Sequence, residues 1–186
     1  MNHRENIQPS LRRKALDILK KIPLSKKQEL LIQNWMSHDA CWFMAVTRTF
    51  GMEATNRINK TAAYEIGKVE SRRIFRELAL APIAALDDCL LVLEVFVNLL
   101  GPRLLDYDIV KLDDRSCQMH VKRCFAYENV SRAGVADQYE CGIFARIEGW
   151  LKGLSLDYEI DPIPEKCLKV QNRQCVYTIS LKWRAM

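Results

Sequence analysis

The chain of 186 residues contains few of the residues that interrupt regular structure. It has seven glycines and six prolines, whereas hydrophobic residues make up 49% of the sequence. A chain of this length and apolar content can bury a core and suits one domain. The composition therefore excludes a disordered chain and indicates a globular protein.

The chain also lacks an apolar run long enough to cross a bilayer. Its most apolar stretch, residues 89–100, contains Glu94 and is shorter than the roughly 20 residues that a membrane span needs. The first eight residues are polar, unlike the core of a signal peptide. Seven cysteines without such a signal favour a reducing compartment. We therefore expect a cytoplasmic protein with no membrane partner.

Several catalytic and nucleotide-binding motifs are missing as well. There is no glycine-rich phosphate loop, no G-x-S-x-G, no H-E-x-x-H and no C-x-x-C in the sequence. Their absence argues against nucleotide binding and against the common hydrolase mechanisms.

Basic residues are concentrated near the start of the chain, at 12–14, 20–21 and 26–27, and the formal net charge is +5. Such clusters occur in arms that bind nucleic acid or a membrane surface. They also occur on the solvated faces of short helices, which is the simpler interpretation. We therefore expect no nucleic-acid partner.

The hydrophobic period changes near residue 102, from 3.6 residues to 2. Before it, the pattern predicts helices over 10–21, 25–50, 58–78 and 82–100, with Gly51 ending the second. After it, the pattern predicts strands over 107–112, 117–125, 156–160 and 175–183 and a helix over 136–153. We therefore predict an α+β fold, in which an N-terminal helical region (1–102) packs on a C-terminal β-β-α-β-β antiparallel sheet unit (103–186) to form one compact domain.

Three cysteines lie in the last third of the chain, at Cys141, Cys167 and Cys175. The predicted elements put them at the start of a helix, in a loop with prolines and at the start of a strand. Thiolates that are distant in sequence can meet around a tetrahedral metal ion. Buried, inert thiols are the alternative, because free cysteine is among the most buried residue types.

Two segments, C-G-I-F-A-R-I-E-G-W-L-K-G-L (141–154) and C-L-K-V-Q-N-R-Q-C-V-Y-T-I (167–179), resemble the small-molecule-binding domain family named after 4-vinyl reductase. This family includes sensor domains of phenol-responsive bacterial activators. The resemblance implies that Cys141, Cys167 and Cys175 hold a zinc ion together with a glutamate. Here Pro164 lies at the glutamate's position, so Glu165 or Cys124 would be the fourth ligand.

The nature of such a site depends on its fourth ligand. Four thiolates would form a closed structural zinc site or, as the less favoured alternative, an iron–sulfur cluster. An open position would leave room for a Lewis-acid role. Because thiolates make zinc electron-rich and a poorer activator of water, we expect a structural role.

Two N-terminal segments, M-S-H-D-A-C-W-F-M-A-V (36–46) and G-M-E-A-T-N-R-I-N-K (51–60), support a second resemblance. Together with the cysteine-rich tail, they are similar to uncharacterised bacterial and archaeal proteins described as L-2-amino-thiazoline-4-carboxylate hydrolase-like, over residues 28 to 183. This resemblance implies a hydrolase that acts on a small cyclic amidine.

Helical spacing brings Trp35, His38, Asp39 and Trp42 within two turns of one predicted helix. A histidine and a carboxylate between indoles could recognise a polar ligand, with His38 as acid or base near neutral pH. In the hydrolase interpretation, His38 and Asp39 or the metal would activate water. The alternative is a partly buried histidine that donates to a backbone carbonyl.

The next predicted helix carries Asn56, Asn59 and Lys60 at steps of three and four. If the two helices pair across Gly51, these side chains could join the ligand site, with Lys60 or Arg73 holding a carboxylate. Surface exposure is the alternative for two asparagines in a helix.

Three functions remain open from the sequence. The first is a small-molecule-binding metalloprotein with a cysteine-ligated, structural zinc site beside a ligand cavity. The second is the cyclic-amidine hydrolase, and the third is a dimeric scaffold subunit that pairs through the apolar fourth helix. We expect a small-molecule ligand and a homodimer.

Overall fold

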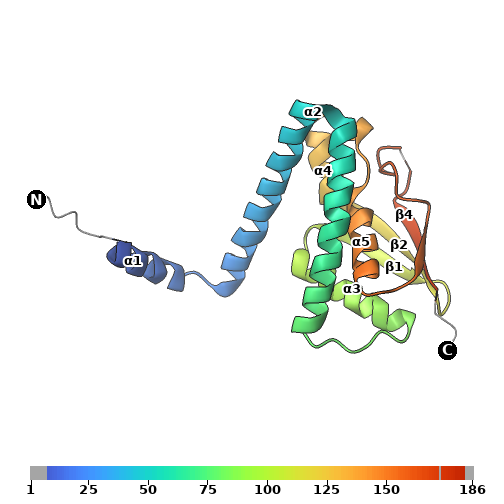
Figure 1. Ribbon diagram of the computed structural model, residues 1–186, viewed down its shortest axis with the longest axis horizontal. Coiled ribbons are helices and arrows are strands. Elements are labelled where there is room, and N and C mark those ends of the chain that lie inside the picture. Colours follow the sequence, from blue (N-terminus) through green and yellow to red (C-terminus); the bar gives the residue numbers. More distant parts are fainter. Residues whose placement is uncertain (1–7, 172, 183–186) are drawn as a thin grey trace, which may run out of the picture. The chain divides into compact units, whose positions relative to one another are not determined.

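The computed structural model describes residues 8–171 and 173–182, and its contacts group the chain into two units, Met1–Cys41 and Trp42–Met186. Figure 1 shows long helices followed by a small sheet. The helices are α1 (Gln8–Lys20), α2 (Leu24–Glu77), α3 (Leu86–Leu100), α4 (Phe125–Arg132), the 3-10 helix η1 (Ala136–Gln138) and α5 (Gly142–Gly153). The strands are β1 (Leu105–Lys111), β2 (Ser116–Cys124), β3 (Tyr158–Asp161) and β4 (Val176–Leu181). The predicted α+β class is therefore confirmed.

Helix α2 contains a break at Gly51, whose backbone has φ 79° and ψ 170°. This left-handed conformation favours glycine, because a Cβ atom would be strained there. The sequence predicted two helices separated at this residue. In the structure the second helix follows the first directly at Gly51, which is therefore a kink with no loop.

The four strands form one antiparallel sheet in the order β1-β2-β4-β3. Alternate residues of β2 and β4 are buried on one face, as the period of two predicted. This buried face carries Cys117, Met119 and Val121 from β2 and Tyr177, Ile179 and Leu181 from β4.

The main core lies between this sheet face and two helices, α3 and α5. Phe96 of α3 is fully buried, and its ring meets the indole of Trp150 of α5 edge to face, with centroids 5.5 Å apart. A second, smaller core joins Met52 of α2 with Val130, Tyr139 and Cys167. The sheet, α3 and α5 therefore form the frame that holds the candidate site.

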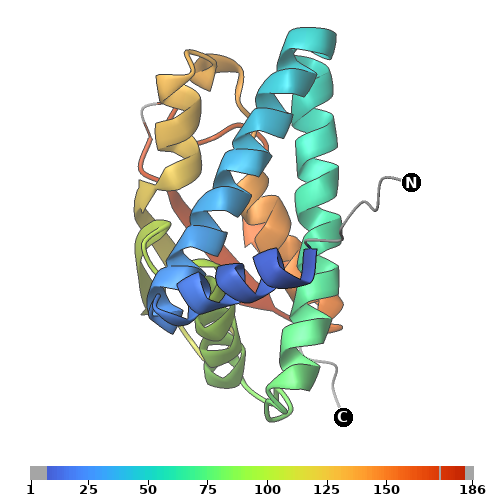
Figure 2. The same cartoon turned by 90° about the vertical axis from the view of Figure 1, so that its left-hand side faces the viewer.

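Small residues let α5 approach the C-terminal half of α2, beside which it lies in Figure 2. A Cβ atom on Gly149 would lie 2.2 Å from the carbonyl oxygen of Tyr64, and one on Gly153 would lie 2.1 Å from Ser71 Oγ. Only glycine fits at such distances. The glycines of the predicted helix 136–153 therefore serve helix–helix contact.

Several predicted boundaries were wrong in detail. The helix expected over 136–153 begins at Gly142, because residues 136–138 form a separate 3-10 turn. The helix expected from residue 82 begins at Leu86, where Asp88 Oδ2 accepts hydrogen bonds from the backbone N–H groups of Ala84 and Ala85. The helix α4 was not predicted. The last strand ends at Leu181 in the structure, and its predicted end, Trp183, lies outside the described residues.

No helix among the described residues combines the length and the apolar character that a bilayer span requires.

Candidate functional site

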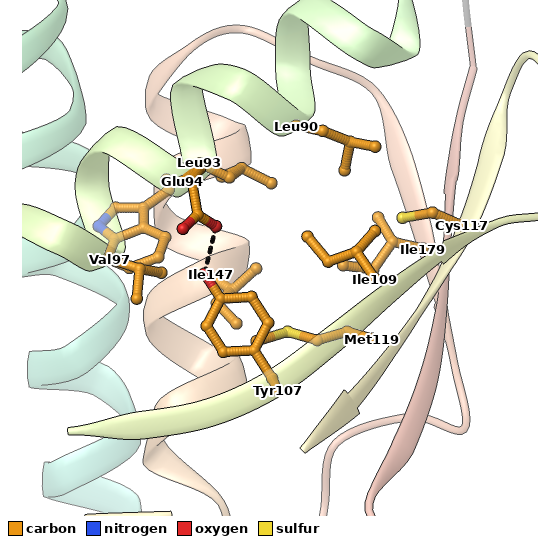
Figure 3. Close-up of a pocket in the computed structure, with 11 residues that line it drawn as sticks. Leu90, Leu93, Glu94, Val97, Tyr107, Ile109, Cys117, Met119, Ile147 and Ile179 are labelled. Carbon is orange, nitrogen blue, oxygen red and sulfur yellow. Dashed lines mark hydrogen bonds between the residues drawn. The ribbon is translucent and has the colours of Figure 1, made fainter. Parts of the chain in front are cut away.

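A narrow apolar slot opens between α3 and the buried face of the sheet (Figure 3). Its cavity volume is about 30 Å³, which is room for about two water molecules. Its walls come from α3, β1, β2, β4 and α5. The lining residues are Leu90, Leu93, Glu94, Val97, Tyr107, Ile109, Cys117, Met119, Ile147, Trp150 and Ile179.

One side of the slot is polar. The Tyr107 hydroxyl donates a hydrogen bond of 2.5 Å to Oε2 of Glu94, as drawn in Figure 3. Burial and the Glu94 carboxylate both raise the pKa of Tyr107 above its ordinary value. The Tyr107 proton therefore stays on the phenol at neutral pH. A ligand in the slot would meet hydrocarbon on most sides and this pair on one.

Cys117 lines the slot, Cys89 lies near Cys117, and each is 1% exposed. Burial raises the pKa of Cys89 to about 12, and the nearby Cys117 thiol adds to this effect. Burial also raises the pKa of Cys117. Both groups are therefore neutral thiols that pack as small apolar side chains.

The four cysteines named as metal ligands gather in a second region, which we call the thiol cluster (Cys124, Cys141, Cys167, Cys175). Cys167, Cys124 and Cys175, in that order of strength, each raise the pKa of Cys141, so the four sulfurs lie within electrostatic reach of one another. Cys141 and Cys167 are buried, and the other two are half-buried. Their role as metal ligands stays a prediction.

Burial dominates the electrostatics of the thiol cluster. It raises the pKa of Cys141 to about 12 and that of Cys175 to about 12, and it raises the pKa of Cys124. Backbone N–H groups oppose this effect: that of Phe144 lowers the pKa of Cys141, and those of Tyr127 and Ala126 lower the pKa of Cys124. Cys141 precedes α5 and Cys124 precedes α4, and a helix N-terminus favours a thiolate. Without a cation, the thiols of Cys124, Cys141 and Cys175 nevertheless stay protonated.

Two buried tyrosines, Tyr139 and Tyr177, lie near the thiol cluster. The Tyr177 ring stacks on Phe144 with centroids 3.7 Å apart. Its hydroxyl has no hydrogen-bond partner within the described part of the chain. After burial, the largest effects on the pKa of Tyr177 come from Cys141, Cys175 and Cys167, which raise it. An unsatisfied buried hydroxyl near three thiols indicates a place where a water or an ion would be favourable.

The donor chemistry of the thiol cluster fits zinc, since Cys₄ is a common set of ligands in structural zinc sites. The arrangement of the side chains does not yet form a coordination shell. Among residues 8–171 and 173–182, no three histidine, cysteine, aspartate or glutamate side chains are placed to hold a metal ion. Glu165, the other predicted fourth ligand, is exposed, and its backbone carbonyl accepts a hydrogen bond from the Cys141 N–H.

The residues predicted on the third helix have structural partners. Asn56 is buried, and its amide donates to the Gln138 carbonyl at 2.7 Å and accepts from the Glu140 N–H at 3.1 Å. Lys60 pairs with Glu140 at 2.8 Å. The side chain of Asn59 lies against Gly142, where a Cβ atom would be 2.6 Å from Asn59 Nδ2. All three hold the segment that leads into α5.

The predicted catalytic pair, His38 and Asp39, is exposed on α2, as are Trp35 and Trp42. None of these four side chains lines the slot. A further histidine, His120 on β2, is half-buried, and its Nε2 lies 3.2 Å from Gln118 Oε1. Hydrolysis of a cyclic amidine through His38 stays a prediction.

The slot residues were missed in the sequence. Tyr107 and Ile109 alternate on β1, and Leu90, Leu93 and Val97 lie at steps of three and four on α3. These patterns predict a strand and a helix and show which face of each is apolar. They could not show that the two faces leave a gap, because the gap depends on how far apart the helix and the sheet pack.

Comparison with known proteins identifies a solved structure of similar fold and a sequence family. No curated protein matches the chain. Among solved structures, the crystal structure of a trafficking protein particle complex subunit 3 from Naegleria fowleri, covalently bound to palmitic acid, is similar, with a TM-score of 0.55 and 13% sequence identity. The match covers 87% of this chain and 99% of that one, and at this identity it shows a shared fold. In sequence, residues 21–177 match a family described as a family of unknown function (DUF6125), and the chain belongs to this family.

Proposed function

We propose that this protein binds a hydrophobic small molecule, such as an aliphatic acyl chain, in the slot beside α3. The observation that carries the proposal is the lining of the slot. Ten of the eleven lining side chains are apolar, aromatic or neutral sulfur groups, and the polar Glu94 is paired with Tyr107. Such a lining favours hydrocarbon and offers no site for a polar or highly charged ligand.

The solved structure of similar fold gives independent support for the class of ligand. That protein carries covalently bound palmitic acid, so a fold of this kind can hold an aliphatic chain. For the present chain we propose reversible binding, since the thiols of Cys89 and Cys117 are both neutral and buried and are therefore poor nucleophiles.

A ligand of this size needs a wider slot than the present one. Helix α3 forms one whole wall through Leu90, Leu93 and Val97. The helix is connected by the irregular segment 78–85 at one end and by Gly101, with φ 141°, at the other. A small outward movement of α3 would therefore open the slot while the sheet and α5 stay packed.

The experiment is a titration with a fluorescent fatty acid, cis-parinaric acid, followed by displacement with palmitate. We expect saturable binding to the wild type. Ile109→Trp should weaken it by about ten-fold, because an indole at this partly exposed position fills the slot. The matched control is Val110→Trp, since Val110 is the neighbour on β1 that does not line the slot.

Two results would contradict the proposal. One is a folded wild type that binds no fatty acid. The other is equal binding by the Ile109→Trp and Val110→Trp variants, which would put the ligand elsewhere.

We also propose that the thiol cluster binds a structural zinc ion, as the resemblance to the 4-vinyl reductase family implies. The gathering of Cys124, Cys141, Cys167 and Cys175 beside the unsatisfied Tyr177 hydroxyl supports it. Zinc would favour the deprotonated form of the thiols. It would also link three parts of the chain, namely the start of α5, the loop that carries Cys167 and the start of β4.

Metal analysis of protein purified without added metal tests the zinc proposal. We expect about one equivalent of zinc, and Cys167→Ser should lower the metal content and the melting temperature together. Cys41→Ser, at an exposed cysteine outside the thiol cluster, is the control and should change neither. A stable, metal-free wild type would end the proposal without affecting the slot.

A further inference from the structure

Helix α1 has an exposed aliphatic stripe. Leu11, Ile18 and Leu19 lie at steps that put them on one face, and they are 54%, 62% and 48% exposed. The helix has no buried residue. An isolated apolar stripe of this kind is stabilised when another apolar phase covers it.

Positive charge is concentrated in α1 and in the residues that directly follow it. Residues 8–27 contain seven lysines and arginines and one aspartate, which gives a net charge of +6 for a protein whose total is +5. Only one intrahelical ion pair is formed in α1, Lys20 with Asp17 at 3.3 Å, and both side chains are largely exposed. The remaining cations of α1 are exposed to solvent.

We propose that α1 is an amphipathic anchor that binds an anionic lipid surface. The aliphatic stripe would enter the boundary between headgroups and acyl chains, while the lysines and arginines on either side contact lipid phosphates and carboxylates. Each cation near such a surface contributes roughly a five-fold gain in partitioning. The helix lies in the membrane plane and does not cross it, so the expectation of no membrane partner, which rested on the absence of a long apolar run, does not apply to it.

The chemistry of α1 favours lipid over two other occupants. A nucleic acid would use the cations but would leave the exposed leucines and isoleucine in water. A second copy of α1 would cover the stripe but would bring together two helices that each carry four lysines and arginines and one aspartate. Only an anionic lipid surface satisfies both features at once.

The location of α1 in the sequence makes the anchor independent of the slot. The family match covers residues 21–177, and α1 (Gln8–Lys20) precedes it. The anchor would therefore be an addition of this chain to a common body. Failure of lipid binding would leave the ligand proposal unchanged, and the reverse also holds.

Vesicle co-sedimentation of the full chain tests the proposal. We expect binding to vesicles of phosphatidylcholine with phosphatidylserine, weak binding to phosphatidylcholine alone, and release as salt increases. The double variant Leu11→Asp with Ile18→Asp should lose roughly ten-fold or more in partitioning, with an unchanged melting temperature because neither residue is buried.

Two matched controls separate the stripe and the charge from general surface effects. Ile163→Asp changes an isoleucine that is 76% exposed outside α1 and should bind as the wild type does. Arg13→Glu with Lys14→Glu should lower binding to anionic vesicles, whereas Arg48→Glu with Arg57→Glu, at exposed positions of α2, should lower it much less.

Three results would overturn the proposal: no binding to either vesicle, equal binding to both kinds, or equal binding by the wild type and the Leu11→Asp, Ile18→Asp variant. Tight binding to a short DNA duplex that the same variant retains would assign α1 to nucleic acid instead.

Discussion

Helices α1 and α3 have similar lengths, 13 and 15 residues, but differ in how many of their side chains are buried. Both carry apolar residues at helical spacing, yet α1 buries none of them and α3 buries six. The difference lies in the residues between. Helix α1 has basic side chains around its stripe, whereas α3 has no basic residue and none of its acidic residues, Asp87, Asp88 and Glu94, is buried. Periodicity gives a helix, and the neighbouring charges help to decide what covers it.

The largest expected effect is in α3. Phe96→Ala should lower the free energy of unfolding by about 3–5 kcal/mol, because it removes a fully buried ring and leaves a cavity against Trp150. Denaturant unfolding measures it. Leu91→Ala, 67% exposed on the same helix, is the control and should stay within about 0.5 kcal/mol of the wild type. Equal effects at both positions would mean that α3 is not packed as described.

A smaller effect, of unusual sign, is expected where α5 meets α2. Alanine is normally favoured over glycine in a helix by about 1 kcal/mol. Gly149→Ala should nevertheless destabilise the protein by about 1–3 kcal/mol, since its Cβ atom would lie 2.2 Å from the Tyr64 carbonyl oxygen. Thr61→Ala, on an exposed part of α2, shows the effect of helix propensity alone. A stabilised Gly149→Ala variant would contradict the close approach.

A pH-dependent effect is expected at the ion pair between α2 and α5, where Arg146 Nε donates to Glu70 Oε2 at 2.8 Å and Arg146 Nη2 to Glu70 Oε1 at 2.9 Å. Burial raises the pKa of Glu70 above its ordinary value of 4.5, although Arg146 acts to lower it. The folded protein therefore holds this proton more tightly than the unfolded chain does. Stability from this group is present below pH 4.5 and is lost as the pH rises through the folded pKa.

The measurement compares the wild type with Glu70→Gln, which cannot titrate at this position. The free energy of unfolding of the wild type, relative to that of the variant, should decrease as the pH rises above about 4.5. An increase over the same range would mean that Arg146 outweighs burial. The exposed pair Lys26–Glu29, at 2.9 Å in α2, should give no comparable difference when Glu29 is changed to Gln.

The smallest effect is expected in α1. Ile18→Ala should change the free energy of unfolding by less than about 0.5 kcal/mol, because the side chain is 62% exposed. Denaturant unfolding without vesicles measures it. A loss comparable to that of Phe96→Ala would show that the body covers α1 in solution, and the contrast between the two helices would then fail.

Much of the fold was predictable from local signals. Alternation at Cys117, Met119 and Val121 predicted the buried face of β2, and Gly51 predicted the break in α2. The short helix α4 was missed because its eight residues lie between a strand and a turn and have one buried side chain, Val130. Boundaries at residues 82–86 and 136–142 depended on a cap and a 3-10 turn, which propensity does not resolve.

The candidate sites were predictable to different degrees. Cys124, Cys141, Cys167 and Cys175 were named from the sequence, and the last two and Cys124 each affect the pKa of Cys141 in the structure. Their role as metal ligands stays a prediction. The slot was not predictable, because its walls are ordinary core residues. The sequence predicted a ligand role for Asn56, but its side chain forms hydrogen bonds with the backbone of Gln138 and Glu140 before α5. Gln138 lies 82 residues along the chain, and no local pattern reveals such a distant partner.

The sequence by itself determined the succession of helices and strands, the concentration of positive charge before residue 28 and the supply of thiols. These follow from periodicity and composition, which act between residues close in the chain. Only the tertiary structure decided that α3 and the sheet leave a slot and that glycines allow α5 to pack closely against α2. Such features depend on distances between elements far apart in sequence, and those distances are set by how whole side-chain surfaces pack together.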